Sequence, residues 1–188
     1  NEVIKILTKF KPKVPNYVRI MRTQRDIPTK VSIAGVDKTN LRQMVQKELK
    51  DPCNCIRCRE INKPITHPEL KVTEYAASKG KEFFLSIEQD NQIIGFCRLR
   101  FPKDYLRKEI TKDSAIIREL HVYGKATNIQ KEGKVQHQGF GKQLMKKAET
   151  ICKENNKKKL LVISGIGVRG YYKKLGYKVD GPYVSKTF

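Results

Sequence analysis

The chain has 188 residues, enough for one globular core and a smaller additional unit. Charged residues make up 31% of it and hydrophobic residues 38%, which excludes an intrinsically disordered chain. Lysine and arginine total 40 against 19 acidic residues, so the net charge of +21 favours an acidic partner, nucleic acid first, over a merely solvated lysine-rich surface. The sequence shows neither a signal peptide nor an apolar run of the about 18 residues that span a membrane, which predicts a cytoplasmic protein without a membrane partner.

Residues 1–50 are strongly basic, with 12 lysines and arginines against four acidic residues. Prolines and aromatic residues are interleaved with these cations, which suits looped or single-stranded RNA better than a duplex. Five of the cations are predicted to contact RNA: Lys11, Lys13, Arg19, Arg22 and Arg25. A strand over residues 16–22 and a helix over 41–49 provide too little core to stand alone, so we interpret residues 1–50 as the end of a larger domain.

Three cysteines lie close together in the next segment: Cys53, Cys55 and Cys58. In a reducing compartment such spacing is more typical of a metal site than of disulfides, and it favours metal over three unused thiols. Residues 51–68 are therefore predicted to be a linker that binds a structural zinc, an ion that usually takes four ligands. The fourth ligand stays open between His67, Cys97 and a group outside this sequence. An iron–sulfur cluster is less favoured because its usual cysteine spacing differs.

From Glu69 onward, strand and helix patterns follow one another. Strands are predicted at residues 70–75, 82–88, 92–101, 115–122, 160–163, 177–179 and 183–188. Helices are predicted at residues 138–155 and 168–175. Strict alternation of side chains places Ile94 on the face opposite Cys97. It also places Ile117, Glu119 and His121 together on one face of their strand.

A loop with two glycines joins the strand at residues 115–122 to the long helix. Gly139 and Gly141 flank Phe140 where the helix is expected to begin. The first N–H groups of a helix lack internal partners and carry partial positive charge, and glycine lets a ligand approach the backbone closely. The loop therefore predicts a site for a phosphate-bearing ligand such as a pyrophosphate.

The order of these elements and two of the motifs resemble the GNAT acetyltransferase family. The loop matches the family's acetyl-CoA pattern Q/R-x-x-G-x-G/A at Gln136, Gly139 and Gly141, and residues 170–177 are similar to a downstream segment of the family. The resemblance implies an α+β GNAT fold over residues 69–188, with a mixed, splayed β-sheet flanked by helices. The acetyl-CoA-binding residues that it implies are Leu120, His121, Val122, Gln136, His137, Gln138, Gly139, Phe140, Gly141, Lys142, Gln143 and Tyr172.

Four residues are candidates for the chemistry. Tyr171 or Tyr172 could donate a proton to the departing CoA thiolate, because a phenol with a pKa of about 10 is protonated at neutral pH. We expect the other tyrosine to be a core residue. Glu119 and His121 lie on a strand with a buried pattern, where ionisable side chains need a partner or a function. The alternative is that both lie at a sheet margin and are exposed to water.

Three segments carry a further resemblance, at residues 19–28, 53–60 and 117–124. They are similar to the catalytic subunits of Elongator, a family of enzymes that carboxymethylate C5 of the wobble uridine at tRNA position 34, and the similarity covers essentially the whole chain. In this family a radical-SAM domain with S-adenosylmethionine and a [4Fe–4S] cluster comes first, so residues 1–50 are expected to be the remnant of that domain. Its C-x-x-x-C…C motif is absent from these 188 residues. We therefore expect this chain to bind and hydrolyse acetyl-CoA and to supply part of the surface for the tRNA anticodon region, but not to complete the modification.

The sequence is also compatible with two other functions. One is a protein lysine acetyltransferase of the histone-modifying type in which Glu119 deprotonates an amine, and the other is a zinc-stabilised RNA-binding module that senses acetyl-CoA. The connection at residues 76–80 is too short for the helices that wall the acceptor pocket of ordinary GNAT enzymes. This makes Glu119 and His121 less suited to amine deprotonation and favours the tRNA function. Further Elongator-like subunits or a homodimer also remain open, as does the choice of tRNA.

Overall fold

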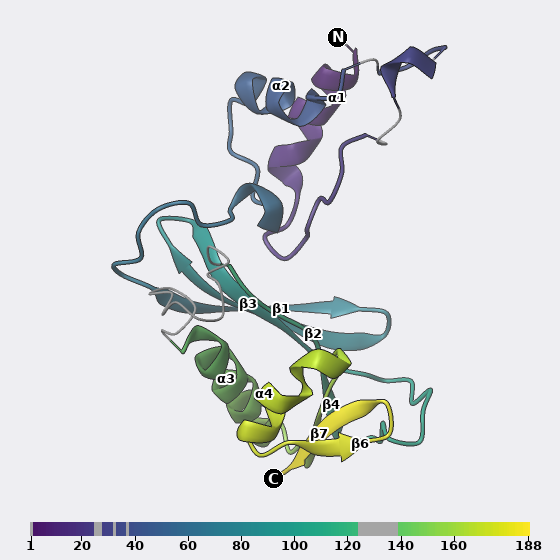
Figure 1. The fold of residues 1–188 in the computed structure, drawn as a ribbon, viewed down its shortest axis with the longest axis vertical. Coiled ribbons are helices and arrows are strands. Elements are labelled where there is room, and N and C mark those ends of the chain that lie inside the picture. The colour runs from purple at the N-terminus through teal and green to yellow at the C-terminus, as the bar shows by residue number, and fades with distance from the viewer. Residues whose placement is uncertain (1, 25–27, 32, 37, 124–138) are drawn as a thin grey trace. The chain divides into compact units, whose positions relative to one another are not determined.

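The computed structural model describes residues 2–24, 28–31, 33–36, 38–123 and 139–188 (Figure 1). The chain forms two compact units, Asn1–Glu60 and Ile61–Phe188. The three clustered cysteines belong to the first unit, so the division falls inside the segment that was expected to be a linker. None of the helices described has the length and apolar character needed to cross a membrane.

The N-terminal unit is built from two helices and a long irregular segment. Its elements are α1 (Glu2–Phe10), η1 (Lys11–Lys13), η2 (Thr29–Val31), α2 (Leu41–Glu48) and η3 (Ile56–Cys58). Helices α1 and α2 pack through Ile4, Leu41 and Val45, which are all buried. The helix predicted at residues 41–49 is confirmed, and this apolar core is small.

The strand predicted over residues 16–22 is wrong, because this segment has no ladder partner among the described residues. Other groups satisfy its backbone instead. The carbonyl of Val18 accepts a hydrogen bond from the N–H of Ile56 at 2.9 Å. The guanidinium of Arg42 donates to the carbonyl of Ile20 at 2.7 Å and to that of Met21 at 3.2 Å. The segment is thus held by the cysteine loop and by a side chain of α2, which alternation in the sequence cannot reveal.

The second unit is a mixed seven-stranded sheet in the order β1-β2-β3-β4-β5-β7-β6. Its strands are β1 (Glu69–Ala77), β2 (Gly80–Gln89), β3 (Gln92–Phe101), β4 (Ser114–Val122), β5 (Lys159–Val162), β6 (Lys178–Asp180) and β7 (Tyr183–Thr187). Its helices are α3 (Phe140–Glu154), η4 (Ile166–Val168) and α4 (Arg169–Lys174). All pairs of neighbouring strands are antiparallel except β4 and β5, which are parallel. The predicted mixed sheet and the positions of its strands are confirmed.

Strand β1 is joined to β2, and β2 to β3, by tight two-residue turns. The turn residues Ser78, Lys79, Asp90 and Asn91 all have positive φ, between 46° and 61°, as primed hairpin turns require. No helix lies between β1 and β2, which confirms the short connection predicted at residues 76–80. The connection from β1 to β2 therefore contributes no helix to either face of the sheet.

Two β-bulges change which side chains share a face. The register between β2 and β3 shifts at Ile87/Glu88 and leaves Ile94 as the extra residue, so Ile94 joins Cys97 in the core and the predicted opposition of these two is wrong. A second shift, opposite Arg98/Leu99, leaves Arg118 as the extra residue of β4. Because an inserted residue reverses the alternation that follows it, the expected grouping of Ile117 with Glu119 and His121 is also wrong.

The main core lies between the sheet and α3, which packs across β2, β3 and β4 (Figure 1). The predicted apolar stripe of α3 is buried: Phe140, Leu144, Ala148 and Ile151. At the far side of α3, the carboxylate of Glu149 accepts hydrogen bonds from Tyr177 at 2.9 Å and Lys186 at 3.0 Å. These contacts fix α3 on the sheet, and with it the position of the helix N-terminus.

Candidate functional site

A cleft opens where β4 and β5 diverge. The two strands pair only over Ser114–Ile117 and Lys159–Val162, and the N–H of Ile163 makes the last contact, donating to the carbonyl of Ile117 at 3.0 Å. Beyond this point β4 continues while the chain after β5 turns toward α4. The opening is a cavity of about 620 Å³. Its lining residues are Leu120, Val122, Gly139, Gly141, Lys142, Val168, Tyr171 and Tyr172.

The N-terminus of α3 supplies backbone donors to this cleft. Gly139 precedes the helix in a left-handed conformation with φ of 74°, which glycine adopts readily. The N–H of Gln143 makes a hydrogen bond to the carbonyl of Gly139 at 3.0 Å, so the N–H groups of the three preceding residues have no intrahelical acceptor. They and the exposed Lys142 lie at the cavity wall and can hold an anionic group. The predicted residues Gln136, His137 and Gln138 lie outside the described residues.

Tyr171 meets the same helix end. A Cβ atom at Gly141 would lie 2.8 Å from the hydroxyl oxygen of Tyr171, so a larger residue at this position would force Tyr171 or α3 to shift. The hydroxyl is buried and has no hydrogen-bond partner among the described residues. A buried, unsatisfied hydroxyl at the wall of a cavity is costly unless a ligand supplies its partner. The cleft therefore fits a polar ligand that reaches this depth.

Tyr172 is the more buried member of the tyrosine pair. It is 6% exposed and belongs to the core, with its ring 5.2 Å from that of Tyr171 and 6.0 Å from that of Tyr177. Burial raises the pKa of Tyr172 to about 12 and also raises the pKa of Tyr171. Both phenols therefore keep their protons at neutral pH, which is the state that a proton donor needs.

Glu119 and His121 face away from the cleft, because the bulge at Arg118 turns Leu120 and Val122 toward it. The carboxylate of Glu119 accepts a hydrogen bond from Arg98 at 3.0 Å, and the His121 ring stacks on Phe96 with centroids 5.8 Å apart. Their predicted catalytic roles remain predictions, now on the face of the sheet opposite the cavity.

Arginines on this second face were missed by sequence reasoning. Glu82 is buried, and one of its oxygens accepts hydrogen bonds from both Arg100 and Arg118 at 2.7 Å. The guanidinium of Arg98 lies 5.5 Å from the centroid of the Phe84 ring. Alternate arginines in β3, opposite an acidic residue in β2, were the available signal. These interactions stabilise the sheet on the face opposite the cleft.

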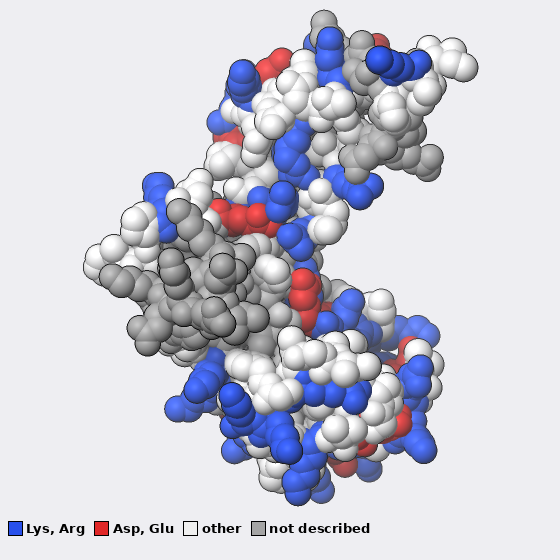
Figure 2. All heavy atoms as spheres, viewed as in Figure 1, with Lys and Arg blue, Asp and Glu red and all other residues white. Residues whose placement is uncertain are grey.

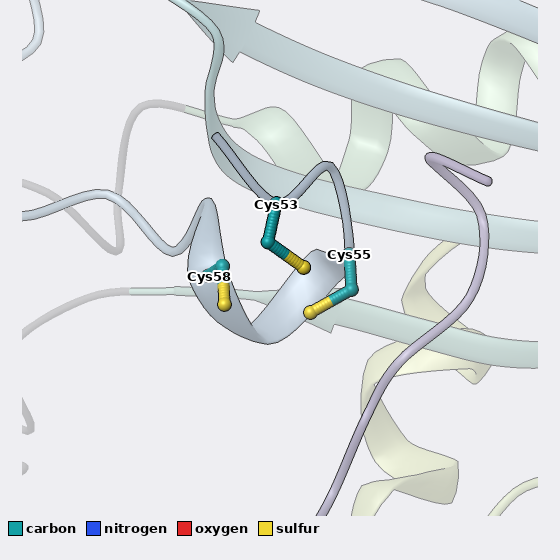
Figure 3. A group of neighbouring side chains, drawn as sticks. All are labelled: Cys53, Cys55 and Cys58. Carbon is teal, nitrogen blue, oxygen red and sulfur yellow. The ribbon is translucent and has the colours of Figure 1, made fainter. Parts of the chain in front are cut away.

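The three cysteines of the N-terminal unit form a compact group (Figure 3). Their sulfur atoms all lie within 4.8 Å of one another and are all free of disulfides. Zinc–sulfur bonds of about 2.3 Å can bridge such a group with a small contraction. A hydrogen bond from the Cys58 thiol is the main cause that lowers the pKa of Cys55 to about 4.

No fourth histidine, cysteine or carboxylate joins the group within the described parts of the chain. Cys97, one proposed fourth ligand, is 0% exposed in the core of the sheet unit, where burial raises its pKa, so its thiol is not accessible to an ion. His67 is exposed, and one of its ring nitrogens lies 3.1 Å from the hydroxyl of Thr66. A donor from outside the described residues or a solvent molecule would complete a tetrahedral site.

Basic side chains surround the sulfur of Cys58. The ammonium of Lys11 lies 3.5 Å from it, and the guanidinium of Arg42 lies 3.8 Å from it. The amide nitrogen of Gln46 lies 3.9 Å away. Sequence reasoning missed Arg42 and Gln46, although their spacing of four residues on a helix places them on one face.

The predicted RNA contacts are spread over different environments. Lys11 is 0% exposed, whereas Lys13 and Arg22 are exposed. Arg19 is partly buried and donates to Glu60 at 3.1 Å. Arg25 lies outside the described residues. Figure 2 shows Lys and Arg side chains spread over the described surface of each unit, with a smaller area of acidic side chains.

Comparison with known proteins places these features in a family. The model of the GNAT acetyltransferase family matches residues 53–177, and the chain belongs to this family. The fold is therefore that of a GNAT acetyltransferase domain.

More particular relatives match nearly the whole chain. A tRNA uridine(34) acetyltransferase from Methanocaldococcus infernus is 46% identical over 98% of this chain and 38% of the relative. Elongator complex protein 3 from Saccharomyces cerevisiae is 43% identical over 99% of this chain and 37% of the relative. The solved structure of Methanocaldococcus infernus Elp3 with an N-terminal deletion superposes with a TM-score of 0.86 and 43% identity, over 98% of this chain and 48% of that one. The chain is thus homologous to the C-terminal GNAT region of these proteins and spans less than half of their length.

Proposed function

We propose that this chain binds acetyl-CoA in the β4–β5 cleft and provides its acetyl group for modification of the wobble uridine of tRNA, at C5 of position 34. One observation carries the proposal. The cleft combines unpaired backbone donors and the unsatisfied Tyr171 hydroxyl in a chain that is 46% identical to a tRNA uridine(34) acetyltransferase. The radical-SAM chemistry of the complete reaction, with S-adenosylmethionine and a [4Fe–4S] cluster, is assigned to a domain outside this chain.

Each wall of the cleft has a role in this proposal. The N–H groups at the start of α3 and the ammonium of Lys142 bind the pyrophosphate of acetyl-CoA. The backbone of β4 around Leu120 and Val122 hydrogen-bonds the amides of the pantetheine arm, where β5 no longer pairs with it. When the thioester C–S bond breaks and the acetyl group passes to water in this chain alone, Tyr171 or Tyr172 donates a proton to the departing CoA thiolate.

The second face of the sheet argues against a protein lysine acetyltransferase. Glu119 is paired with Arg98 and faces away from the cavity, and the two-residue turn between β1 and β2 provides no helical wall for a peptide. We therefore assign the acceptor to the anticodon region of tRNA, bound with the help of exposed cations of the N-terminal unit such as Lys13 and Arg22.

The test is to incubate the chain with acetyl-CoA and to measure the release of free CoA thiol with tRNA, with a lysine peptide, or alone. Stimulation by tRNA is expected. Stimulation by the peptide that is lost in Glu119→Gln would support the lysine acetyltransferase, and tight acetyl-CoA binding without cleavage would support the sensor. Formation of modified uridine by this chain alone would contradict the assignment of the radical step to another domain.

We further propose that Cys53, Cys55 and Cys58 bind a structural zinc. Three buried or half-buried thiols, whose sulfur atoms all lie within 4.8 Å of one another, support this choice. Five free cysteines also suit a reducing compartment, so we propose a cytoplasmic location. Metal analysis of the purified chain, before and after dialysis against a chelator, tests the zinc assignment.

A further inference from the structure

Lys11 is a buried cation in the N-terminal unit. Its side chain is 0% exposed, although lysine is almost never fully buried without a partner. Moving an ammonium group out of water costs several kcal/mol unless an anion compensates for it. Its ammonium nitrogen lies 3.5 Å from the sulfur of Cys58.

A second cation approaches the same sulfur from a different element. Arg42 on α2 lies 3.8 Å from it, and a guanidinium cannot lose its proton in a protein. Gln46, one turn further along α2, directs its amide nitrogen to the same atom at 3.9 Å. Three nitrogen donors from two elements converge on one sulfur. A metal-bound thiolate accepts such hydrogen bonds better than a neutral thiol, which is a weak acceptor.

We infer that Lys11 is the outer-sphere charge partner of a three-thiolate centre for a divalent, thiolate-preferring metal ion. This inference rests on the proposed zinc site. Three thiolates around a divalent ion leave one net negative charge, which the buried Lys11 ammonium compensates from inside the unit and the Arg42 guanidinium compensates from α2.

The geometry also connects the metal centre to the small core of the N-terminal unit. Lys11 directly follows α1, and Arg42 and Gln46 lie on α2, so both helices are joined to the loop that carries the cysteines. The helices otherwise share only a few buried apolar side chains. Metal occupancy is therefore expected to stabilise the packing of α1 on α2, since small cores commonly depend on a metal.

Two lysines of η1 provide a matched pair for the experiment. Lys11 is buried and Lys13 is exposed, two residues apart in the same short helix. Zinc affinity is measured for the whole chain by competition with a chromophoric chelator, and cobalt binding by thiolate-to-cobalt charge-transfer absorption. Lys11→Met is expected to bind zinc about 10- to 100-fold more weakly, the usual effect of removing an outer-shell partner. Lys13→Met is expected to bind zinc like the unmodified chain.

The variant Lys11→Arg keeps the positive charge but changes the shape of the buried side chain, so it distinguishes an effect of charge from an effect of packing. If Lys11 acts through its charge, the arginine variant retains more zinc affinity than the methionine variant. If Lys11 only fills space, methionine is the better replacement and the order reverses, which would overturn the inference. Arg42→Gln gives a second measurement should Lys11→Met fail to fold, and an unchanged zinc affinity there would also count against it. An unmodified chain that binds neither zinc nor cobalt would refute the zinc assignment itself, whereas equal binding by Lys11→Met refutes only the role of Lys11.

Discussion

The thiol cluster and the β4–β5 cleft are two candidate sites that are built by opposite means. The cluster uses side chains that lie within six residues of sequence, Cys53 to Cys58, and cations that surround them. The cleft uses mainly backbone, brought together from β4, the start of α3 and α4. A side-chain site depends on a few atoms and can be removed by one substitution. A site made of backbone groups depends on the positions of entire strands and helices. A larger side chain that blocks the site damages it more than the loss of any one side chain.

The largest expected effect is the loss of the thiol cluster. Cys58→Ser should abolish stoichiometric zinc binding and destabilise the N-terminal unit by several kcal/mol, because structural zinc contributes about 10–16 kcal/mol of apparent binding free energy in small zinc domains. Metal content and thermal unfolding measure both effects. Cys152→Ser is the matched control, since this buried cysteine lies in the core of the sheet unit. It should destabilise that unit while zinc binding stays intact.

The cleft should respond next, through its tyrosines. Replacing the tyrosine that donates the proton by phenylalanine should lower the rate of CoA release by about 100-fold or more, as is usual for a general acid. Tyr171→Phe should leave the unfolding free energy nearly unchanged, because its hydroxyl has no partner in the described residues. Comparison of the two single variants, by rate at saturating acetyl-CoA, identifies the donor. If both variants release CoA as fast as the unmodified chain, neither phenol is the proton donor.

The pH dependence sharpens the same assignment. A proton donor is active below its pKa, and burial raises the pKa of Tyr172 to about 12. If Tyr172 is the donor, the rate of CoA release should therefore show no alkaline decline attributable to an ordinary phenol near pH 10. A decline centred near pH 10 that disappears in Tyr172→Phe would contradict the raised pKa.

A smaller effect is expected from added bulk in the backbone site. Gly141→Ala places a methyl group 2.8 Å from the Tyr171 hydroxyl, so Tyr171 or α3 must shift. Overpacking of this kind costs about 1–3 kcal/mol, which corresponds to about 5- to 150-fold weaker acetyl-CoA binding if the cost falls on the bound state. Isothermal titration measures the affinity. Gly170→Ala in α4 is the control, because no atom within 4 Å would oppose its methyl group.

The two sites also differ in how much of them the sequence could predict. The cysteine spacing was enough to identify the thiols, and the Gly139–Gly141 pattern with its neighbouring strand and helix was enough to identify the cleft. The burial of Lys11 could not be foreseen, because a lysine in a basic segment has the same local pattern whether it faces solvent or a distant sulfur.

The bulge at Arg118 was equally hidden. A single inserted residue leaves the alternation of apolar residues plausible on both sides, so Glu119 and His121 were placed on the wrong face. The strands themselves were predictable, because each has a long β-rich pattern bounded by turn residues. Strand register and long-range pairing depend on contacts between distant segments, and the local pattern of apolar and polar residues does not determine these contacts.

The smallest expected effect is on the salt dependence of tRNA binding. It distinguishes the two lysines of η1, Lys13 on the surface and Lys11 at the thiol cluster. If exposed cations of the N-terminal unit bind tRNA, Lys13→Met should reduce the slope of log affinity against log salt concentration by about 0.7, the value for one single-stranded phosphate contact. Lys11→Met should leave this slope unchanged, because its ammonium is fully buried against Cys58. Filter binding of tRNA over a range of salt concentrations measures both slopes. Zinc affinity should respond in the opposite way: Lys11→Met should weaken it and Lys13→Met should leave it unchanged. This pair of lysines therefore distinguishes a surface charge that contacts RNA from a buried charge that compensates thiolates. A change in salt slope for Lys11→Met alone would place the RNA contact at the metal site and would break the distinction between the two.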